Sequence, residues 1–144
     1  MKVSTKTRYG IRAMVELAVG FGDGPVQLKV IARRQAISVK YLEQLISVLK
    51  SGGFVHSIRG TKGGYVLAKR PDKIRLNEIF AVLEGDVVTT DCVRNAEVCS
   101  RSCDCVTRDI WAEVQRAIDE ILGSVTLQDM VDRLNSRGKT SYQI

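Results

Sequence analysis

Two short amphipathic segments, residues 27–34 and 38–51, restrict the possible folds more than any other part of the chain. In the first segment, Leu28, Ile31 and Ala32 recur at helical spacing. The second segment carries one apolar stripe, formed by Leu42, Leu45, Ile46 and Leu49. Only a brief turn separates the two segments. Two short helices with a tight connection form a helix-turn-helix, so we expect this motif here.

A β-hairpin is predicted directly after these two helices. Gly52 and Gly53 end the second helix, and residues 54–59 have the β-branched and aromatic content of a strand. Residues 60–64, Gly-Thr-Lys-Gly-Gly, are typical of a turn, and residues 65–68 return as the partner strand. A hairpin in this position is a wing, so the sequence predicts a winged helix-turn-helix.

Helices are also predicted on both sides of the winged motif. The apolar spacing indicates helices over residues 5–19, 76–84 and 106–122, and a last helix that starts at Thr126. We therefore expect a mainly α fold with a small β-hairpin, in which a long helix follows the winged helix-turn-helix. The expected organisation is a DNA-binding domain over 1–85, a cysteine-rich loop over 86–105, a dimerisation helix and C-terminal helix over 106–135, and a flexible tail over 136–144.

The long predicted helix has one broad apolar face, formed by Ile110, Val114, Ala117, Ile118, Ile121 and Leu122. Such a face either packs back on its own domain or pairs with a second copy of the chain. We favour pairing, and we therefore expect a homodimer.

Charged residues divide the chain into a basic and an acidic half. Residues 1–75 hold 15 Lys and Arg against 4 Asp and Glu, whereas residues 76–144 hold 7 against 12. Because Lys and Arg that neutralise phosphates supply most of the nonspecific affinity for nucleic acids, the basic half predicts double-stranded DNA as a partner. Charge alone leaves a lopsided solvated surface as the alternative.

Nothing in the sequence predicts a membrane partner or export. No apolar run approaches the ~20 residues that span a bilayer. The first residues, Met-Lys-Val-Ser-Thr-Lys, lack the apolar region of a signal peptide. We therefore expect a cytoplasmic protein.

The second helix of the motif has a polar face suited to reading bases. Opposite its apolar stripe lie Lys40, Glu43, Gln44 and Ser47, beside Tyr41. A carboxylate is repelled by phosphate, so Glu43 fits a DNA surface only if it accepts a hydrogen bond from a base, such as cytosine N4. A solvated face with i,i+4 pairing is the alternative.

Two further basic sites flank this helix. Arg59 and Lys62 lie at the glycine-rich tip of the predicted wing, where an arginine suits a minor groove. Ser4 and Lys6 stand at the start of the first helix, where amide donors and positive charge could hold a phosphate. The phosphate contacts at the first helix would position the protein on DNA rather than read its sequence.

The four cysteines all lie within residues 92–105, with the spacing Cys-x6-Cys-x3-Cys-x-Cys. A cytoplasmic location disfavours disulfides, and the spacing fits structural zinc only loosely. Thiolates on a loop suit an iron-sulfur cluster, whose irons accept cysteine ligands at varied spacing. The residues therefore rank an iron-sulfur cluster first, redox-active thiols second and zinc third.

Three stretches of the chain stand out together: Ser-Thr-Lys-Thr-Arg-Tyr-Gly at 4–10, Tyr-Leu-Glu-Gln-Leu at 41–45 and Arg-Gly-Thr-Lys-Gly-Gly-Tyr at 59–65. They resemble the IscR-type regulators of the Rrf family, which are dimeric winged-helix proteins of bacteria. The resemblance runs from the start to about Asp132. It implies base contacts by Tyr41, Glu43 and Gln44, a minor-groove contact by Arg59, phosphate contacts by Ser4 and Lys6, and dimerisation through the helix after the cysteines.

The resemblance also implies an iron-sulfur cluster held by three cysteines, which match Cys92, Cys99 and Cys105. The family's fourth ligand is absent, because Arg108 stands where the IscR type has a histidine and Arg8 stands where a nitric-oxide-sensing branch has an aspartate. The fourth ligand therefore stays open. Its candidates are Cys103, Asp104, Glu97 and a non-protein ligand, whereas His56 is read as an ordinary polar strand residue. Of the two cluster types, 2Fe-2S is favoured over 4Fe-4S.

These features favour a homodimeric transcription regulator that senses cluster, iron or redox status. One alternative is a winged-helix regulator without a cluster that responds to thiol chemistry, a metabolite or a partner enzyme. Another is a winged-helix protein-interaction module with a zinc clip. An enzyme is not expected, since no Ser-His-Asp or Cys-His constellation is present and the glycines at 60–64 lie between strands rather than before a helix.

Overall fold

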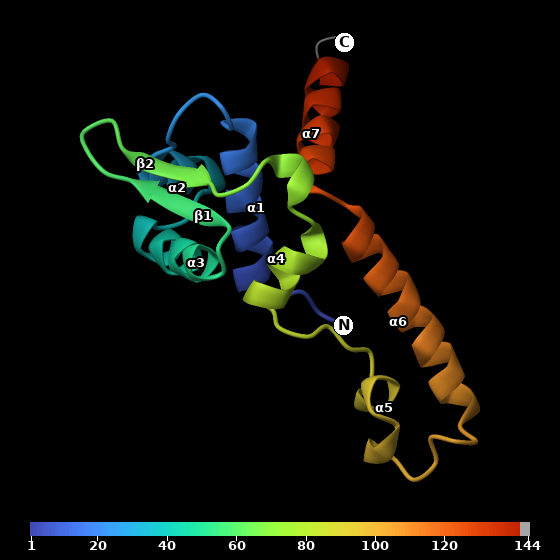
Figure 1. Cartoon of the computed structure of the whole chain (residues 1–144). Helices are drawn as coiled ribbons and strands as arrows, with labels where there is room; N and C mark the ends of the chain where they lie inside the picture. Colours follow the sequence, from blue (N-terminus) through green and yellow to red (C-terminus); the bar gives the residue numbers. More distant parts are fainter. Residues whose placement is uncertain (142–144) are drawn as a thin grey trace.

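The computed structural model describes residues 1–141 and is mainly helical, with one antiparallel hairpin (Figure 1). Its elements, in chain order, are α1 (Thr5–Val19), α2 (Leu28–Gln35), α3 (Val39–Ser51), β1 (Val55–Ile58), β2 (Gly64–Leu67), η1 (Pro71–Lys73), α4 (Leu76–Leu83), α5 (Asp91–Arg94), η2 (Ala96–Val98), α6 (Val106–Ser124) and α7 (Leu127–Ser141). The predicted fold class, a winged helix-turn-helix followed by a long helix, is confirmed.

A single hydrophobic core joins the helix-turn-helix to its neighbours. The apolar stripe predicted on α3 is fully buried, together with Met14 of α1, Ile31 of α2 and Ile79 of α4. Leu127 and Val131 bring the first turns of α7 into the same core. Because the stripe of α3 faces inward, the opposite face of that helix must point to solvent.

The wing pairs residue 55 with 67 and residue 58 with 64. Val26, just before α2, adds a bridge to Tyr65, with the two backbone hydrogen bonds at 2.8 and 2.9 Å. The backbone approaches so closely there that a Cβ on Gly64 would lie 2.5 Å from the carbonyl oxygen of Val26. A hydrogen bond of 3.2 Å from Lys50 Nζ to Ser57 Oγ ties the end of α3 to β1. The wing is therefore fixed to the helix-turn-helix.

Helices α1 and α4 cross at Gly10. A Cβ at this position would lie 2.5 Å from Cδ1 of Leu83, which is buried. The missing side chain of Gly10 is what lets the last turn of α4 lie against α1. Leu83 also precedes the segment that leads to the cysteines, so this crossing sets where that segment leaves the domain.

Helix α6 extends away from the body formed by the first four α-helices (Figure 1). Its one buried side chain is Gln115, whereas apolar side chains remain exposed along most of its length: Val106, Ile110, Trp111, Val114 and Ile121. Part of the predicted apolar face, including Ile118 and Leu122, is half-buried. The remainder has no cover in one copy of the chain.

Some element boundaries differ from those expected. Helix α7 continues to Ser141, although a flexible tail was predicted from residue 136, and the rest of that tail, 142–144, lies outside the described residues. Helix α5 and the turn η2 divide the segment that was predicted as a cysteine-rich loop. Within residues 1–141, no helix has both the length and the hydrophobicity required to cross a membrane.

Candidate nucleic-acid interface and cysteine loop

Helix α3 presents the predicted base-reading side chains to solvent. Ser38 caps the helix, its Oγ accepting a 3.1 Å hydrogen bond from the backbone N–H of Tyr41. Four side chains are exposed, and within the described part of the chain none of them makes a hydrogen bond or ion pair: Lys40, Glu43, Gln44 and Ser47. An unpaired carboxylate and amide beside a lysine leave donors and acceptors available to base edges.

Tyr41 is oriented by an aromatic contact that the sequence did not predict. Its ring meets that of Tyr9 on α1 edge to face, with centroids 6.3 Å apart and planes at 83°. The Arg12 guanidinium lies 5.5 Å from the centroid of the Tyr9 ring, within the range of a cation–π contact. Tyr9 belongs to the 4–10 stretch quoted above, but nothing in the spacing of the two tyrosines indicated that they meet.

The tip of the wing is exposed and positively charged. Arg59 follows directly after β1, and Gly60 takes a φ of +112°, a conformation that glycine adopts without strain. Arg59 and Lys62 are both exposed, and neither side chain has a hydrogen-bond or ion-pair partner within residues 1–141. Both cations are thus placed on the hairpin as the sequence predicted.

The N-terminus of α1 already holds an internal carboxylate. Glu84, at the C-cap of α4, accepts a 2.7 Å hydrogen bond from Ser4 Oγ, a 3.3 Å bond from the Ser4 backbone N–H and a bond from Thr7 Oγ1. Mainly through the Thr7 and Ser4 hydroxyls, these bonds lower the pKa of Glu84. Lys6 is exposed beside them. A phosphate at Ser4 would have to compete with Glu84, whereas Lys6 remains accessible.

The four cysteines are free thiols spread along the loop before α6. Cys92 and Cys105 are half-buried, and Cys99 and Cys103 are exposed. Among residues 1–141, no three His, Cys, Asp or Glu side chains lie close enough together to hold a metal ion. The four thiols are a donor set of the type that iron-sulfur clusters use, but joining three of them requires the loop to change conformation.

The limbs of the loop are held by hydrogen bonds to the first turn of α6. Cys105 is the N-cap of α6, and its Sγ lies 3.1 Å from Thr107 Oγ1. That hydroxyl, followed by the backbone N–H of Arg108, lowers the pKa of the Cys105 thiol. Arg108 Nε donates a 2.9 Å hydrogen bond to the carbonyl oxygen of Cys92. The residue in the position of the family's histidine therefore ties α6 to the backbone of the first cysteine.

The other side chains considered as a fourth ligand are all exposed, but they lie on two different elements. Cys103, Asp104 and Glu97 are exposed on the loop itself. His56 is exposed on β1 of the wing, as an ordinary strand residue would be. The structure does not bring any of the four together with the three matched cysteines.

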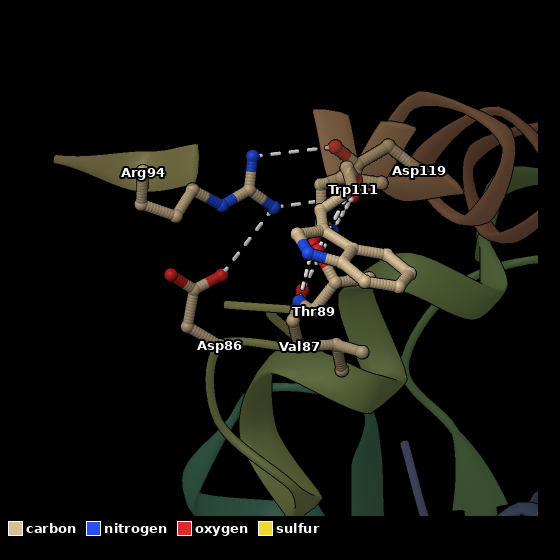
Figure 2. Close-up of polar contacts among 7 residues, drawn as sticks. Asp86, Val87, Thr89, Arg94, Trp111 and Asp119 are labelled. Atoms are coloured by element: carbon tan, nitrogen blue, oxygen red, sulfur yellow. Dashed lines mark hydrogen bonds and ion pairs between the residues drawn. The ribbon is translucent and has the colours of Figure 1, made fainter. Parts of the chain in front are cut away.

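A polar cluster fastens the segment before the cysteines to α6 (Figure 2). Gln115 accepts a hydrogen bond from the Thr89 backbone N–H and donates one to the Val87 carbonyl oxygen, each 2.7 Å long. Arg94 pairs with Asp119 through two hydrogen bonds of 3.2 Å. Sequence reasoning missed this cluster, because glutamine is usually a surface residue and no local pattern indicated that Gln115 is buried.

Comparison with known proteins places these features in a family. The family described as Rrf2, iron-dependent transcriptional regulator, matches residues 3–133. The chain is 43% identical over 130 residues to the transcriptional regulator CymR of Bacillus subtilis, which covers 90% of this chain and 89% of CymR. It is 37% identical over 131 residues to the transcriptional regulator IscR of Xenorhabdus nematophila, covering 91% of this chain and 79% of IscR.

Solved structures agree with this assignment. The structure of CymR, described as the global cysteine regulator of B. subtilis, has a TM-score of 0.81 and 41% identity, covering 92% of this chain and 98% of CymR. The structure of T. potens IscR has a TM-score of 0.75 and 45% identity, covering 93% and 88%. These likenesses extend over the winged helix, the cysteine loop and α6, and the relatives are transcription regulators rather than enzymes. The chain therefore belongs to the Rrf2 family of winged-helix, DNA-binding transcription regulators.

Proposed function

We propose that this regulator is a homodimer that senses iron-sulfur cluster, iron or redox status through a cluster held by Cys92, Cys99 and Cys105. The observation that carries the proposal is the position of the thiols. All the cysteines of the chain lie in one loop, next to the helix whose apolar face is uncovered. The iron-dependent description of the family supports the same reading.

On DNA, α3 would lie in the major groove and the wing beside it. Tyr41, Glu43 and Gln44 would contact bases, with Lys40 and Ser47 at the edges of the same face. Arg59 would enter the minor groove, with Lys62 near the backbone, and Lys6 and Ser4 would contact phosphate. Exposure supports the roles of all these side chains except Tyr41, which is half-buried against Tyr9, and Ser4, which Glu84 engages.

Replacing Glu43 and Lys6 separately tests these roles. Glu43→Ala should change the preference among operator sequences by about 1–3 kcal/mol while leaving nonspecific affinity nearly unchanged. Lys6→Ala should weaken all sequences alike and reduce the slope of log affinity against log salt by about 1. Equal losses at every sequence for both variants would refute base reading by Glu43.

The homodimer would form through α6. Val106 is 75% exposed and Ile121 is 61% exposed at opposite ends of this helix. An apolar stripe of this length costs free energy in water, and a second copy of the same helix would cover it. Two paired copies would also present two reading helices to two half-sites.

The loop residues would hold the cluster as thiolates. Cys105 favours this state, because hydrogen bonds to its sulfur stabilise the charged form. A bound cluster would supply one-electron redox chemistry and sensitivity to iron supply and oxidants. We favour a 2Fe-2S cluster with Cys103 as the fourth ligand, and Asp104, Glu97 or a non-protein ligand are the alternatives.

Anaerobic purification tests the cofactor. A brown protein with visible absorbance and stoichiometric iron and sulfide is the expected result. Cys92→Ser should lose most of the iron, and Cys103→Ser shows whether that thiol is the fourth ligand. A colourless, iron-free wild-type protein from the same preparation would refute the cluster.

A regulator without a cluster, responding to thiol oxidation or to a partner enzyme, is the second candidate. Two observations favour it: the similarity to CymR, described as a global cysteine regulator, and the separation of the thiols. In that case the anaerobic protein would be colourless, and its DNA affinity would change with reversible thiol oxidation or with addition of the partner. Within this family of DNA-binding regulators, a zinc-clipped interaction module is no longer needed as an explanation.

A further inference from the structure

Gln115 is unusual among the residues of α6 because it is a polar side chain in a buried position. It is 2% exposed, whereas most of the charged and apolar side chains of the same helix face solvent. A buried carboxamide is costly unless its N–H groups and its oxygen are hydrogen-bonded. The hydrogen-bond partners of a buried glutamine are therefore the groups that its side chain holds in place.

The bonds of Gln115 go to the segment between α4 and α5. Its oxygen accepts from the Thr89 N–H, and its nitrogen donates to the Val87 carbonyl at 2.7 Å and to Asp119 Oδ1 at 3.0 Å. Both N–H groups of the carboxamide and one lone pair are thereby used. Since two of the three partners are backbone groups, the contact fixes the path of the chain rather than a particular side chain.

The segment runs antiparallel to α6 from this point. Thr89 Oγ1 donates a 3.2 Å hydrogen bond to the carbonyl oxygen of Trp111, about one turn before Gln115. Next along the segment, the carbonyl oxygen of Cys92 accepts from Arg108, about one turn earlier again. This path ends at the first turn of α6, whose N-cap is Cys105.

An ion pair next to Gln115 adds a second contact between this segment and α6. Arg94 is bonded to both carboxylate oxygens of Asp119, and its guanidinium lies 3.7 Å from Asp86 (Figure 2). Asp119 in turn accepts from Gln115. The glutamine therefore stands between the backbone contact and the ion pair, where its loss would loosen both.

We propose that Gln115 is a positioning residue that fixes the register of segment 87–92 on α6 and so holds Cys92 beside the turn that carries Cys105. A slip of one helical turn, about 5.4 Å, would move the backbone of Cys92 away from Arg108 and the first turn of α6. The proposal rests on the proposed function for its consequence, since the position of Cys92 matters most if the loop holds a cluster. Its structural part concerns the chain alone.

Alkylation of the iron-free, reduced protein tests this structural part. The rate at which iodoacetamide modifies Cys92 is measured by peptide mass spectrometry, with Cys103 as the internal reference. Gln115→Met keeps the length of the side chain but none of its hydrogen bonds. It should raise the Cys92 rate about tenfold, as expected for the loss of buried hydrogen bonds, and leave the Cys103 rate unchanged. Glu113→Met, at an exposed position of the same helix, is the matched control.

The results separate the two proposals. An unchanged Cys92 rate in a folded Gln115→Met protein overturns the positioning role, whether or not the wild type holds iron. Gln115→Glu can still accept from Thr89, but its second oxygen would face the Val87 carbonyl oxygen and Asp119 Oδ1 without a proton to donate. Its Cys92 rate should therefore rise at least as much as in Gln115→Met, and it replaces the methionine variant if that one fails to fold. Reconstitution with iron and sulfide should then give less iron per chain in Gln115→Met than in Glu113→Met. If the wild-type protein is iron-free but Gln115→Met still raises the Cys92 rate, the cluster is refuted and the positioning role stands.

Discussion

Replacing Gly10 by alanine measures how closely α1 and α4 are packed where the DNA-binding domain leads into the cysteine loop. The new Cβ would lie 2.5 Å from Leu83 Cδ1 and 3.1 Å from Cδ2. Carbon atoms rest at about 3.5–4.0 Å, so the leucine would have to move by about 1 Å. Overpacking of this kind costs about 1–3 kcal/mol. Alanine regains about 1 kcal/mol of helix propensity, which leaves a net loss of about 0–2 kcal/mol.

A double-mutant cycle isolates the contact. Leu83 is 5% exposed, so Leu83→Ala alone should cost about 2–5 kcal/mol. In that background the three atoms nearest to the new Cβ are gone, so Gly10→Ala should stabilise the protein by up to about 1 kcal/mol. The double variant should thus be more stable than the sum of the single changes predicts, by about 1–3 kcal/mol.

Urea unfolding at a fixed protein concentration provides the assay, because the stability of a dimer depends on concentration. Gly138→Ala in α7 is the control, since a Cβ there meets nothing within 4 Å, and it should be neutral or slightly stabilising. Additive effects of Gly10→Ala and Leu83→Ala, within about 0.5 kcal/mol, would refute the close crossing.

Three further changes test the site and the interface. Glu84 has a lowered pKa, so its stabilising effect is fully present above the ordinary carboxyl pKa of 4.5 and is lost as the pH falls through the lower pKa of the folded protein. Glu84→Gln should therefore flatten the acid side of a plot of melting temperature against pH, and an unchanged plot would contradict the capping role. Tyr9→Leu removes the aromatic partner of Tyr41 and should reduce operator affinity more than nonspecific affinity in a fluorescence anisotropy titration; an equal reduction of both would argue against this orienting contact. Ile121→Asp should dissociate the proposed homodimer in sedimentation velocity, whereas Arg116→Asp, also exposed on α6, serves as a control, and a dimeric Ile121→Asp protein would exclude that face.

Much of the winged-helix domain could be predicted from local sequence patterns. The apolar stripe of α3 and the glycines around the hairpin are local signals, and the structure has both elements within one or two residues of the expected limits. The end of α7 was missed because residues 136–141 are polar. Polar residues without an apolar face predict a tail, yet they continue a helix whose first turns are anchored in the core.

The candidate site divides in the same way. Residue type and helical period indicated which side chains of α3 face outward, and the exposure of Glu43 and Gln44 agrees with that expectation. The role of Ser4 was inferred from its place at a helix N-terminus and from the family resemblance. Glu84 lies 80 residues further along the chain, and no local pattern could place its carboxylate at that N-terminus.

The sequence by itself therefore determined the main helices and the hairpin, their inward and outward faces, the basic half and the loop that holds every cysteine, because each of these depends on periodicity or composition over a short span. Only the tertiary structure decided which distant groups meet: Leu83 against Gly10, Tyr9 against Tyr41, and Gln115 against the segment that carries Cys92. Such contacts depend on how helices cross and how a connecting segment runs along a neighbour. Those properties follow from packing of the whole chain rather than from any stretch of it.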